Sequence, residues 1–290
     1  MRLRRLSRRL SLDLCIILRA YLEKPRTNLG WKGLINDPDL NETYQINKGI
    51  RISRQLYASL AGVGVPLAGE MLDTISPQFL SDLISMGAIG ARTAESQLHR
   101  EVASGLPFPV GFKNATDGGV DVAINSLNSA KAQHHFISLS KPGLASIVHT
   151  GGNDDCFVVL RGGTKGTNFG PKSVSAVHEM LRRKGQREVV MIDCSHGNSE
   201  KDFRKQANVA QIVGDQLQTG ERGIIGVMIE SNIHEGRQEI PANGIAGLKE
   251  GVSITDGCIG WDTTVAVLEQ LAESVRVRRK IISSAPELPN

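Results

Sequence analysis

Cationic side chains follow apolar segments that have the character of β-strands. The first such segment, Leu14–Leu18, runs directly into Arg19, and Lys24 and Arg26 follow within a few residues. Arginine and lysine are almost never buried without a partner, and the guanidinium fork matches the oxygens of phosphate and carboxylate groups. This segment therefore predicts a surface that binds phosphorylated substrates. The alternative is a strand end whose cations are only solvated.

The same arrangement occurs at three further segments. Arg92, Lys113 and Arg161 each stand next to small residues at the end of a short apolar run. Small residues let the main chain approach a ligand while the cation projects beside it. So many cations at equivalent strand ends predict an anionic ligand. The glycine-rich run 162–167 lacks the spacing of a nucleotide-binding P-loop, so a nucleotide is not predicted.

A second set of residues has the composition of a metal site. His196 follows one apolar segment, Glu230 follows the next, and Asp256 comes after a short polar stretch. One imidazole and two carboxylates suit a divalent cation such as manganese, iron, cobalt or zinc. The alternatives are a loop histidine that is only hydrogen-bonded, and carboxylates that pair with the cations described above.

Composition places the chain among globular proteins and excludes several classes of function. The 290 residues are 40% hydrophobic and 22% charged, and aromatic residues make up only 4%, which argues against stacking platforms for nucleic acid. Five arginines in the segment 1–11 account for more than the whole net charge of +4, so nucleic acid is not an expected partner. No apolar run approaches the ~18 residues that would indicate a membrane span. The four cysteines form no CxxC pair, which indicates reduced thiols and a cytoplasmic protein.

Apolar runs alternate with longer helical stretches along the chain. The expected strands are Leu14–Leu18, Val65–Met71, Ala88–Ala91, Val110–Lys113, Phe157–Leu160, Val189–Cys194 and Ile224–Ile229. The expected helices are Ile50–Gly62, Pro77–Met86, Ala94–Ala103, Gly119–Ala132, Lys172–Lys184, Glu200–Gln218 and Thr263–Arg279, and an added β-hairpin is expected at 136–148.

Strands that alternate with helices predict a parallel sheet, either open or closed into a barrel. Polar residues stand at the end of every expected strand, which favours the barrel, because a barrel takes its functional groups from many strand ends. Seven strands are one short of the eight of a (β/α)8 barrel. We therefore expect an incomplete TIM barrel at 12–280 that lacks its first βα unit, preceded by a disordered or misassigned basic segment at 1–11 and followed by a tail at 281–290.

Several motifs resemble those of the type I 3-deoxy-D-arabino-heptulosonate 7-phosphate (DAHP) synthases, and most closely those of fungal members. The resemblance covers roughly residues 12–280 in the right order. The motifs that carry it are Arg19–Thr27, Gly30–Pro38, Ala68–Glu70, Gly90–Thr93, Gly111–Asn114, Leu160–Gly163, Asp193–His196 and Ser253–Trp261.

The resemblance implies a metal-dependent transferase of the shikimate pathway, which supplies aromatic amino acids. The reaction would condense phosphoenolpyruvate with erythrose 4-phosphate, with Lys24 and His196 as catalytic residues. The implied ligands of the phosphoenolpyruvate phosphate are Arg92, Lys113 and Arg161. Its carboxylate would be bound by Arg19 and Lys24, and the phosphate of erythrose 4-phosphate by Arg26 and Thr27. The single divalent metal would be held by His196, Glu230 and Asp256.

One departure from the family concerns the metal. The family carries a Gly-Pro-Cys-Ser motif whose cysteine is a fourth metal ligand, and this sequence has no such motif. Cys194 and Cys258 each lie two residues from an implied ligand, and the alternative to a metal contact is a buried structural thiol. The missing motif leads us to expect a truncated chain of impaired activity.

Other functions and partners stay open at this point. One alternative is an impaired relative that acts as a binding or regulatory subunit. Another is a synthase that uses arabinose 5-phosphate, against which the motif at 24–27 argues. Feedback by phenylalanine or tyrosine and a homo-oligomeric state are family expectations, and Pro107 departs from the serine that relatives often carry near the effector pocket.

Overall fold

The computed structural model describes residues 1–26, 28–241 and 244–284. The chain forms two compact units. Unit 1 comprises Met1, Ile17–Val159 and Gln238–Glu250, and unit 2 comprises Arg2–Ile16, Leu160–Arg237 and Gly251–Asn290.

Unit 1 is built on parallel strands. Strands β1 (Leu18–Arg19), β2 (Leu67–Glu70), β3 (Met86–Ile89), β4 (Val110–Lys113) and β7 (Phe157–Leu160) pair in that order, each parallel to the next. All residues of β4 and β7 are buried, as expected for strands covered on both faces. Because neighbouring strands are parallel, their carboxyl ends lie at one edge of the sheet.

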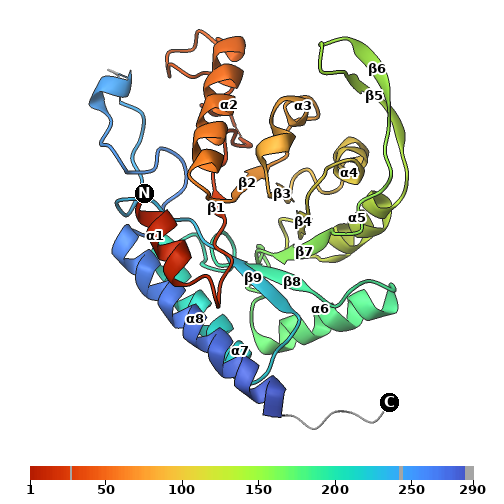
Figure 1. Cartoon of the computed structure of the whole chain (residues 1–290), viewed down its shortest axis with the longest axis vertical. Helices are drawn as coiled ribbons and strands as arrows, with labels where there is room; N and C mark the ends of the chain where they lie inside the picture. The colour runs from red at the N-terminus through yellow and green to blue at the C-terminus, as the bar shows by residue number, and fades with distance from the viewer. Residues whose placement is uncertain (27, 242–243, 285–290) are drawn as a thin grey trace. The chain divides into compact units, whose positions relative to one another are not determined.

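Helices follow the strands of unit 1 and cover the sheet (Figure 1). They are α2 (Ile46–Gly62), α3 (Pro77–Leu80) with the 3₁₀ turn Ser81–Leu83, α4 (Gln97–Ser104) and α5 (Asp121–Lys131), and a further 3₁₀ turn spans Gly244–Gly247. One core cluster joins Leu22 and Ile35 to Tyr57 of α2, Leu67 of β2 and Leu80 of α3.

The predicted hairpin is confirmed. Strands β5 (His135–Leu139) and β6 (Ala145–His149) pair antiparallel, from His135 opposite His149 to Leu139 opposite Ala145. Figure 1 shows them as a long ribbon that projects from unit 1. Ile137 and Ile147 are directly opposite each other and both are exposed.

Unit 2 contains the parallel strands β8 (Val190–Asp193) and β9 (Ile224–Met228). Its helices are α1 (Arg2–Arg9), α6 (Pro171–Arg183), α7 (Gln206–Gln218) and α8 (Trp261–Ser284), and the 3₁₀ turn Phe203–Lys205 precedes α7. Figure 1 shows α1 and α7 beside the long helix α8.

The sheet order confirms the expected fold class. The strands follow one another as β1-β2-β3-β4-β7-β8-β9, which is the order of an α/β barrel that is left open. The parallel sheet has seven strands in the described residues, one fewer than the eight of a complete barrel. No helix of the described residues has the length and apolar character needed to cross a bilayer.

The expectation of a disordered segment at 1–11 is wrong. Residues Arg2–Arg9 form helix α1, and Leu6 and Leu10 are buried in one cluster with Ala272 of α8. The spacing of Leu3, Leu6 and Leu10 places three apolar side chains on one helical face, while the arginines face outward.

Several expected elements have other bounds, and for two of them the contacts give the reason. The strand expected at Leu14–Leu18 begins only at Leu18, because Leu14 and Ile16 pack in the cluster of α1 and α8 instead of pairing. The helix expected at Pro77–Met86 ends early, because the N–H of Ser85 pairs with the carbonyl of Leu67 and Met86 already belongs to β3.

Candidate active site

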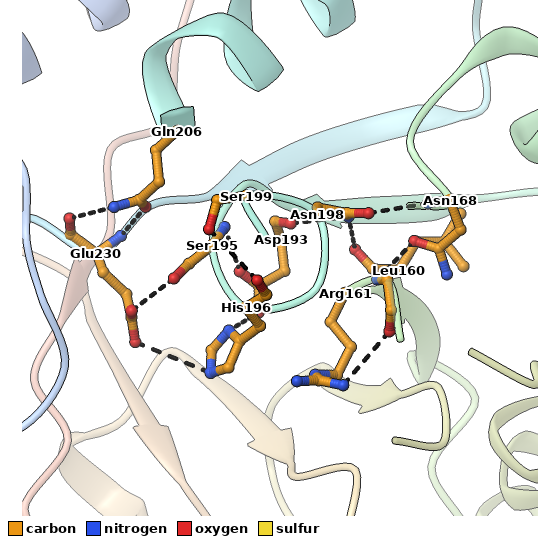
Figure 2. Close-up of polar contacts among 11 residues, drawn as sticks. Leu160, Arg161, Asn168, Asp193, Ser195, His196, Asn198, Ser199, Gln206 and Glu230 are labelled. Atoms are coloured by element: carbon orange, nitrogen blue, oxygen red, sulfur yellow. Dashed lines mark hydrogen bonds and ion pairs between the residues drawn. The ribbon is translucent and has the colours of Figure 1, made fainter. Parts of the chain in front are cut away.

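The loop after β8 carries the best-defined polar cluster of unit 2. Asp193 ends the strand and is fully buried, and its Oδ1 accepts a 2.9 Å hydrogen bond from the main-chain N–H of Ser195. The other oxygen, Oδ2, lies 2.9 Å from Nδ1 of His196. His196 has a left-handed backbone with φ of 52°, which is uncommon for a residue with a side chain. This turn directs the imidazole back toward the strand ends (Figure 2).

Glu230 lies beyond the end of β9 and is buried on the other side of this imidazole. The hydroxyl of Ser195 donates a 2.6 Å hydrogen bond to Oε2 of Glu230. Gln206, the first residue of α7, binds the main chain of Glu230 twice: its Nε2 donates to the carbonyl at 3.0 Å, and its Oε1 accepts from the N–H at 2.8 Å. The backbone and one carboxylate oxygen of Glu230 are therefore fixed.

Three potential metal ligands converge here, as predicted. One ligand atom each of His196, Glu230 and Asp256 lies within 4.8 Å of the other two. Nε2 of His196 is 4.0 Å from Oε1 of Glu230. Two ligands that are each roughly 2.0–2.2 Å from one zinc ion can be up to about 4 Å apart. The chemical types of the three donors and the His196–Glu230 distance therefore fit a divalent cation, and Nδ1 of His196 faces the carboxylate of Asp193, as is usual for a metal-bound histidine.

Neither cysteine near this group belongs to it. Among the described residues, the group comprises the histidine and the two carboxylates alone. Cys194 is fully buried, and burial, followed by the charge of Asp193, raises the pKa of its thiol far above the ordinary value. The sulfur of Cys258 donates to the carbonyl of Asp256 at 3.6 Å. Cys194 is therefore a buried structural thiol that stays protonated.

Arg161 begins the loop that follows β7 and is half-buried. Its Nη1 donates to the carbonyl of Gly162 at 3.3 Å. Gly162 has φ of 67°, and its N–H donates to Oδ1 of Asn168 at 2.7 Å. Figure 2 shows this loop next to the loop of His196.

Unit 1 holds the other predicted cations. Arg19, Arg92 and Lys113 stand at or just beyond the carboxyl ends of β1, β3 and β4, so the parallel sheet brings them to one edge. Lys113 is buried, Arg92 is exposed, and the guanidinium of Arg19 stacks over the ring of Tyr21 at 4.0 Å.

The segment after β1 carries Lys24 and Arg26, the last two of the predicted substrate-binding cations that lie in the described residues. Lys24 is half-buried, and its main-chain N–H donates to the carbonyl of Lys32 at 2.6 Å. Arg26 is exposed, with its guanidinium against Gly30. Thr27 lies outside the described residues.

Glu23, which directly precedes Lys24, is buried and pairs with the half-buried carboxyl group of Asp73. Burial, followed by a hydrogen bond with Asp73 and the negative charge of Asp73, raises the pKa of Glu23 to about 7, although Lys32, 3.6 Å away, acts to lower it. Burial also acts to raise the pKa of Asp73, but hydrogen bonds from Glu23, Ser76 and Ile75 outweigh it and lower that pKa. Glu23 therefore carries the proton of this pair.

The residues that position the side chains of His196 and Glu230 were not identified from the sequence. Ser195 stands inside the motif that was singled out, and the hydroxyl next to His196 was a usable signal. Gln206 gave none, because its partner Glu230 is 24 positions away in the sequence.

The chain matches known proteins over most of its length. The model of the DAHP synthetase I family matches residues 1–269. The phenylalanine-inhibited phospho-2-dehydro-3-deoxyheptonate aldolase of Saccharomyces cerevisiae is 60% identical over 286 residues, which cover 97% of this chain and 77% of that protein. The tyrosine-inhibited enzyme of Candida albicans is 55% identical, with 97% and 77% covered. A solved phospho-2-dehydro-3-deoxyheptonate aldolase from Francisella tularensis has a TM-score of 0.93 and 48% identity, with 96% of this chain and 80% of that chain covered.

Proposed function

The chain belongs to the DAHP synthetase I family, and we propose that it condenses phosphoenolpyruvate with D-erythrose 4-phosphate and water to DAHP and phosphate. This reaction is the first step of the shikimate pathway. The observation that carries the proposal is the convergence of His196, Glu230 and Asp256 within 4.8 Å, in a chain whose relatives bear the name of this activity.

The metal ligands of the proposed reaction are His196, Glu230 and Asp256. A divalent cation bound to them, whether manganese, iron, cobalt or zinc, would polarise the aldehyde oxygen of erythrose 4-phosphate as a Lewis acid. Asp193 lies behind the imidazole of His196, with Oδ2 2.9 Å from Nδ1, and the hydroxyl of Ser195 binds one oxygen of the Glu230 carboxylate while the other lies toward the imidazole. These contacts hold the side chains of His196 and Glu230 in place before a metal ion or a substrate binds.

The cations would bind two substrates that repel each other. We assign Arg92, Lys113 and Arg161 to the phosphate of phosphoenolpyruvate, and Arg19 and Lys24 to its carboxylate. Arg26 and Thr27 are assigned to the phosphate of erythrose 4-phosphate. A buried ammonium such as that of Lys113 interacts more strongly with an anion than a solvated one, because the local dielectric constant is low.

The chemistry forms one carbon–carbon bond and one carbon–oxygen bond, the latter from water, and breaks the carbon–oxygen bond to phosphate. C3 of the enol attacks the aldehyde carbon, the aldehyde oxygen takes up a proton, and water adds at C2. Phosphate then leaves with the electrons of the C2–O bond. Fixed positive charges position the two polyanions and stabilise the charge that accumulates on the departing phosphate.

An assay with two aldose phosphates tests the proposal. The purified chain is given Mn²⁺, and loss of phosphoenolpyruvate and release of phosphate are followed with erythrose 4-phosphate or arabinose 5-phosphate. With erythrose 4-phosphate we expect the amount of phosphoenolpyruvate lost to equal the amount of phosphate released. After removal of metal with EDTA we expect no turnover. Turnover with arabinose 5-phosphate alone, or no turnover with either sugar, would contradict the proposal.

We also propose that an aromatic amino acid inhibits the chain. The relatives in yeast and Candida albicans are named as phenylalanine-inhibited and tyrosine-inhibited. Titration of the active chain with each amino acid separately, with tryptophan as a comparison, tests this. Unchanged rates with both phenylalanine and tyrosine would refute it.

A further inference from the structure

Asn198 joins two loops of unit 2 through its side chain. It lies two residues after His196 and is only 3% exposed. Its Nδ2 donates to the carbonyl of Leu160 at 3.0 Å and to the carbonyl of Asp193 at 2.9 Å. Its Oδ1 accepts a 2.9 Å hydrogen bond from the main-chain N–H of Asn168 (Figure 2). Both N–H bonds of the amide are thus used, and so is its oxygen.

The partners of Asn198 are the strand ends that carry the proposed site. Leu160 is the last residue of β7 and immediately precedes Arg161, and Asp193 is the last residue of β8. The main-chain N–H of Asn198 also lies 3.1 Å from both the carbonyl of Arg161 and that of Ser195. One residue therefore binds the backbone on both sides of the Arg161 α-carbon and the backbone that leads to His196.

The two loops pack backbone against backbone. A Cβ atom on Gly162 would lie 2.6 Å from the main-chain nitrogen of Asn198, and a Cβ on Gly197 would lie 2.5 Å from that of Gly163. Such approaches are possible only for glycine. Because no side chain separates the loops, a shift of one loop is passed directly to the other.

We propose that Asn198 is a positioning residue that holds Arg161 and His196 in register with each other. The inference rests on the proposed function, in which Arg161 binds the phosphate of phosphoenolpyruvate and His196 binds metal. Asn198 touches neither ligand. It acts through the carbonyls of Leu160 and Asp193, and its loss disturbs metal binding and phosphoenolpyruvate binding together.

Two substitutions separate this role from a general structural one. N198D keeps the shape and the acceptor for Asn168 but removes both donated hydrogen bonds, and a carboxylate facing two carbonyl oxygens is repelled. N168A removes the bond to the N–H of Gly162 but keeps the bond to Asn198, because Asn168 binds Asn198 through its main chain. N198D therefore disturbs both loops, and N168A disturbs the Arg161 loop alone.

A matched control is available in unit 1. Asn153 is also buried, and its Nδ2 donates to the carbonyls of Ala103 and Phe108 at 3.1 and 3.0 Å. N153D makes the same chemical change at an asparagine whose partners include none of the proposed site residues.

The experiment measures Mn²⁺ affinity and substrate kinetics on the same proteins. Free Mn²⁺ is followed by electron paramagnetic resonance, which needs no activity, and KM for phosphoenolpyruvate is measured at saturating Mn²⁺. For N198D we expect the Mn²⁺ dissociation constant and KM each to rise about tenfold, as is typical when a group behind a ligand is removed. For N168A only KM rises, and for N153D neither changes.

The inference is overturned if N198D changes neither quantity or only one of them. It is also overturned if N153D reproduces both changes, because the effect would then follow from any buried asparagine. The variants H196A and R161A distinguish failure of this inference from failure of the proposed function. If H196A leaves Mn²⁺ affinity intact or R161A leaves KM intact, the assigned ligands are wrong. If N198D does not fold, N198S is measured instead and must show the same pair of changes.

Discussion

The hydroxyl of Ser195 and the carboxylate of Glu230 form a buried hydrogen bond of 2.6 Å between residues that are 35 positions apart in the sequence. The bond takes up Oε2 of Glu230 and leaves Oε1 at 4.0 Å from Nε2 of His196. Ser195 thereby fixes the orientation in which the carboxylate of Glu230 faces the imidazole.

Replacement of Ser195 by alanine should weaken metal binding without weakening substrate binding. The Glu230 carboxylate loses the donor that fixes it, so we expect S195A to raise the Mn²⁺ dissociation constant about tenfold. KM for phosphoenolpyruvate at saturating Mn²⁺ should stay within about twofold of wild type, because the contacts of the Arg161 loop are untouched. Calorimetric titration with Mn²⁺ measures the first quantity. An unchanged dissociation constant would show that the serine does not orient the ligand.

The buried carboxyl group of Glu23 should make stability depend on pH. The pKa of Glu23 is raised from 4.5 to about 7 in the folded chain. Between these values the folded chain keeps a proton that the unfolded chain has released, so the free energy of unfolding falls as pH rises through this window. One proton contributes a slope of about 1.4 kcal/mol per pH unit.

The variant E23Q isolates this contribution, because glutamine resembles the protonated acid and does not ionise. Urea unfolding of wild type and E23Q is compared at several pH values from about 4.5 to 7.5. The wild type should lose stability relative to E23Q as pH rises, and the difference should level off above the folded pKa. Parallel pH dependences of the two proteins would mean that Glu23 ionises normally in the fold.

Tyr57 should stabilise the end of β1 through its hydroxyl. The buried Tyr57 hydroxyl donates to the carbonyl of Ala20 at 2.5 Å, and Ala20 follows Arg19 directly. Y57F leaves this carbonyl without its donor, so we expect a loss of about 1–3 kcal/mol in the free energy of unfolding. Chemical unfolding measures it, and Y44F, which changes an exposed tyrosine, is the control. Equal stabilities of Y57F and Y44F would contradict the assignment.

Helix α1 should contribute to the core of unit 2 even though five of its residues are arginines. Leu6 is 4% exposed and packs with Ala272, so L6A should lower the free energy of unfolding by about 2–4 kcal/mol. Leu12 is 86% exposed, and L12A should change stability by less than about 0.5 kcal/mol. If both substitutions had the same small effect, α1 would not be packed in solution.

The sequence predicts the strands that are buried on both faces better than the elements at the edges of the fold. The bounds of β4 and β7 are as expected, because four consecutive buried residues fit no other element of that length. The apolar run at 14–17 has the same character, but Leu14 and Ile16 pack with α8, about 250 residues later in the chain. Packing partners that distant leave no trace in a local pattern.

The candidate site could likewise be predicted only in part from the sequence. The three residues that we propose as metal ligands could be singled out from the sequence, since one imidazole and two carboxylates form a donor set that suits a divalent cation. The groups that position them could not, because a serine, a glutamine or an asparagine has many roles. The raised pKa of Glu23 also depends on a residue 50 positions away, and no motif marks that pair.

The central claim is most directly tested by phosphate release from phosphoenolpyruvate in the presence of the purified chain and Mn²⁺. We predict release that requires erythrose 4-phosphate, stops when the metal is removed, and is lost in E230Q, which keeps the size of Glu230 but not its charge. Release that continues without metal, or that E230Q retains at the wild-type rate, would contradict the account.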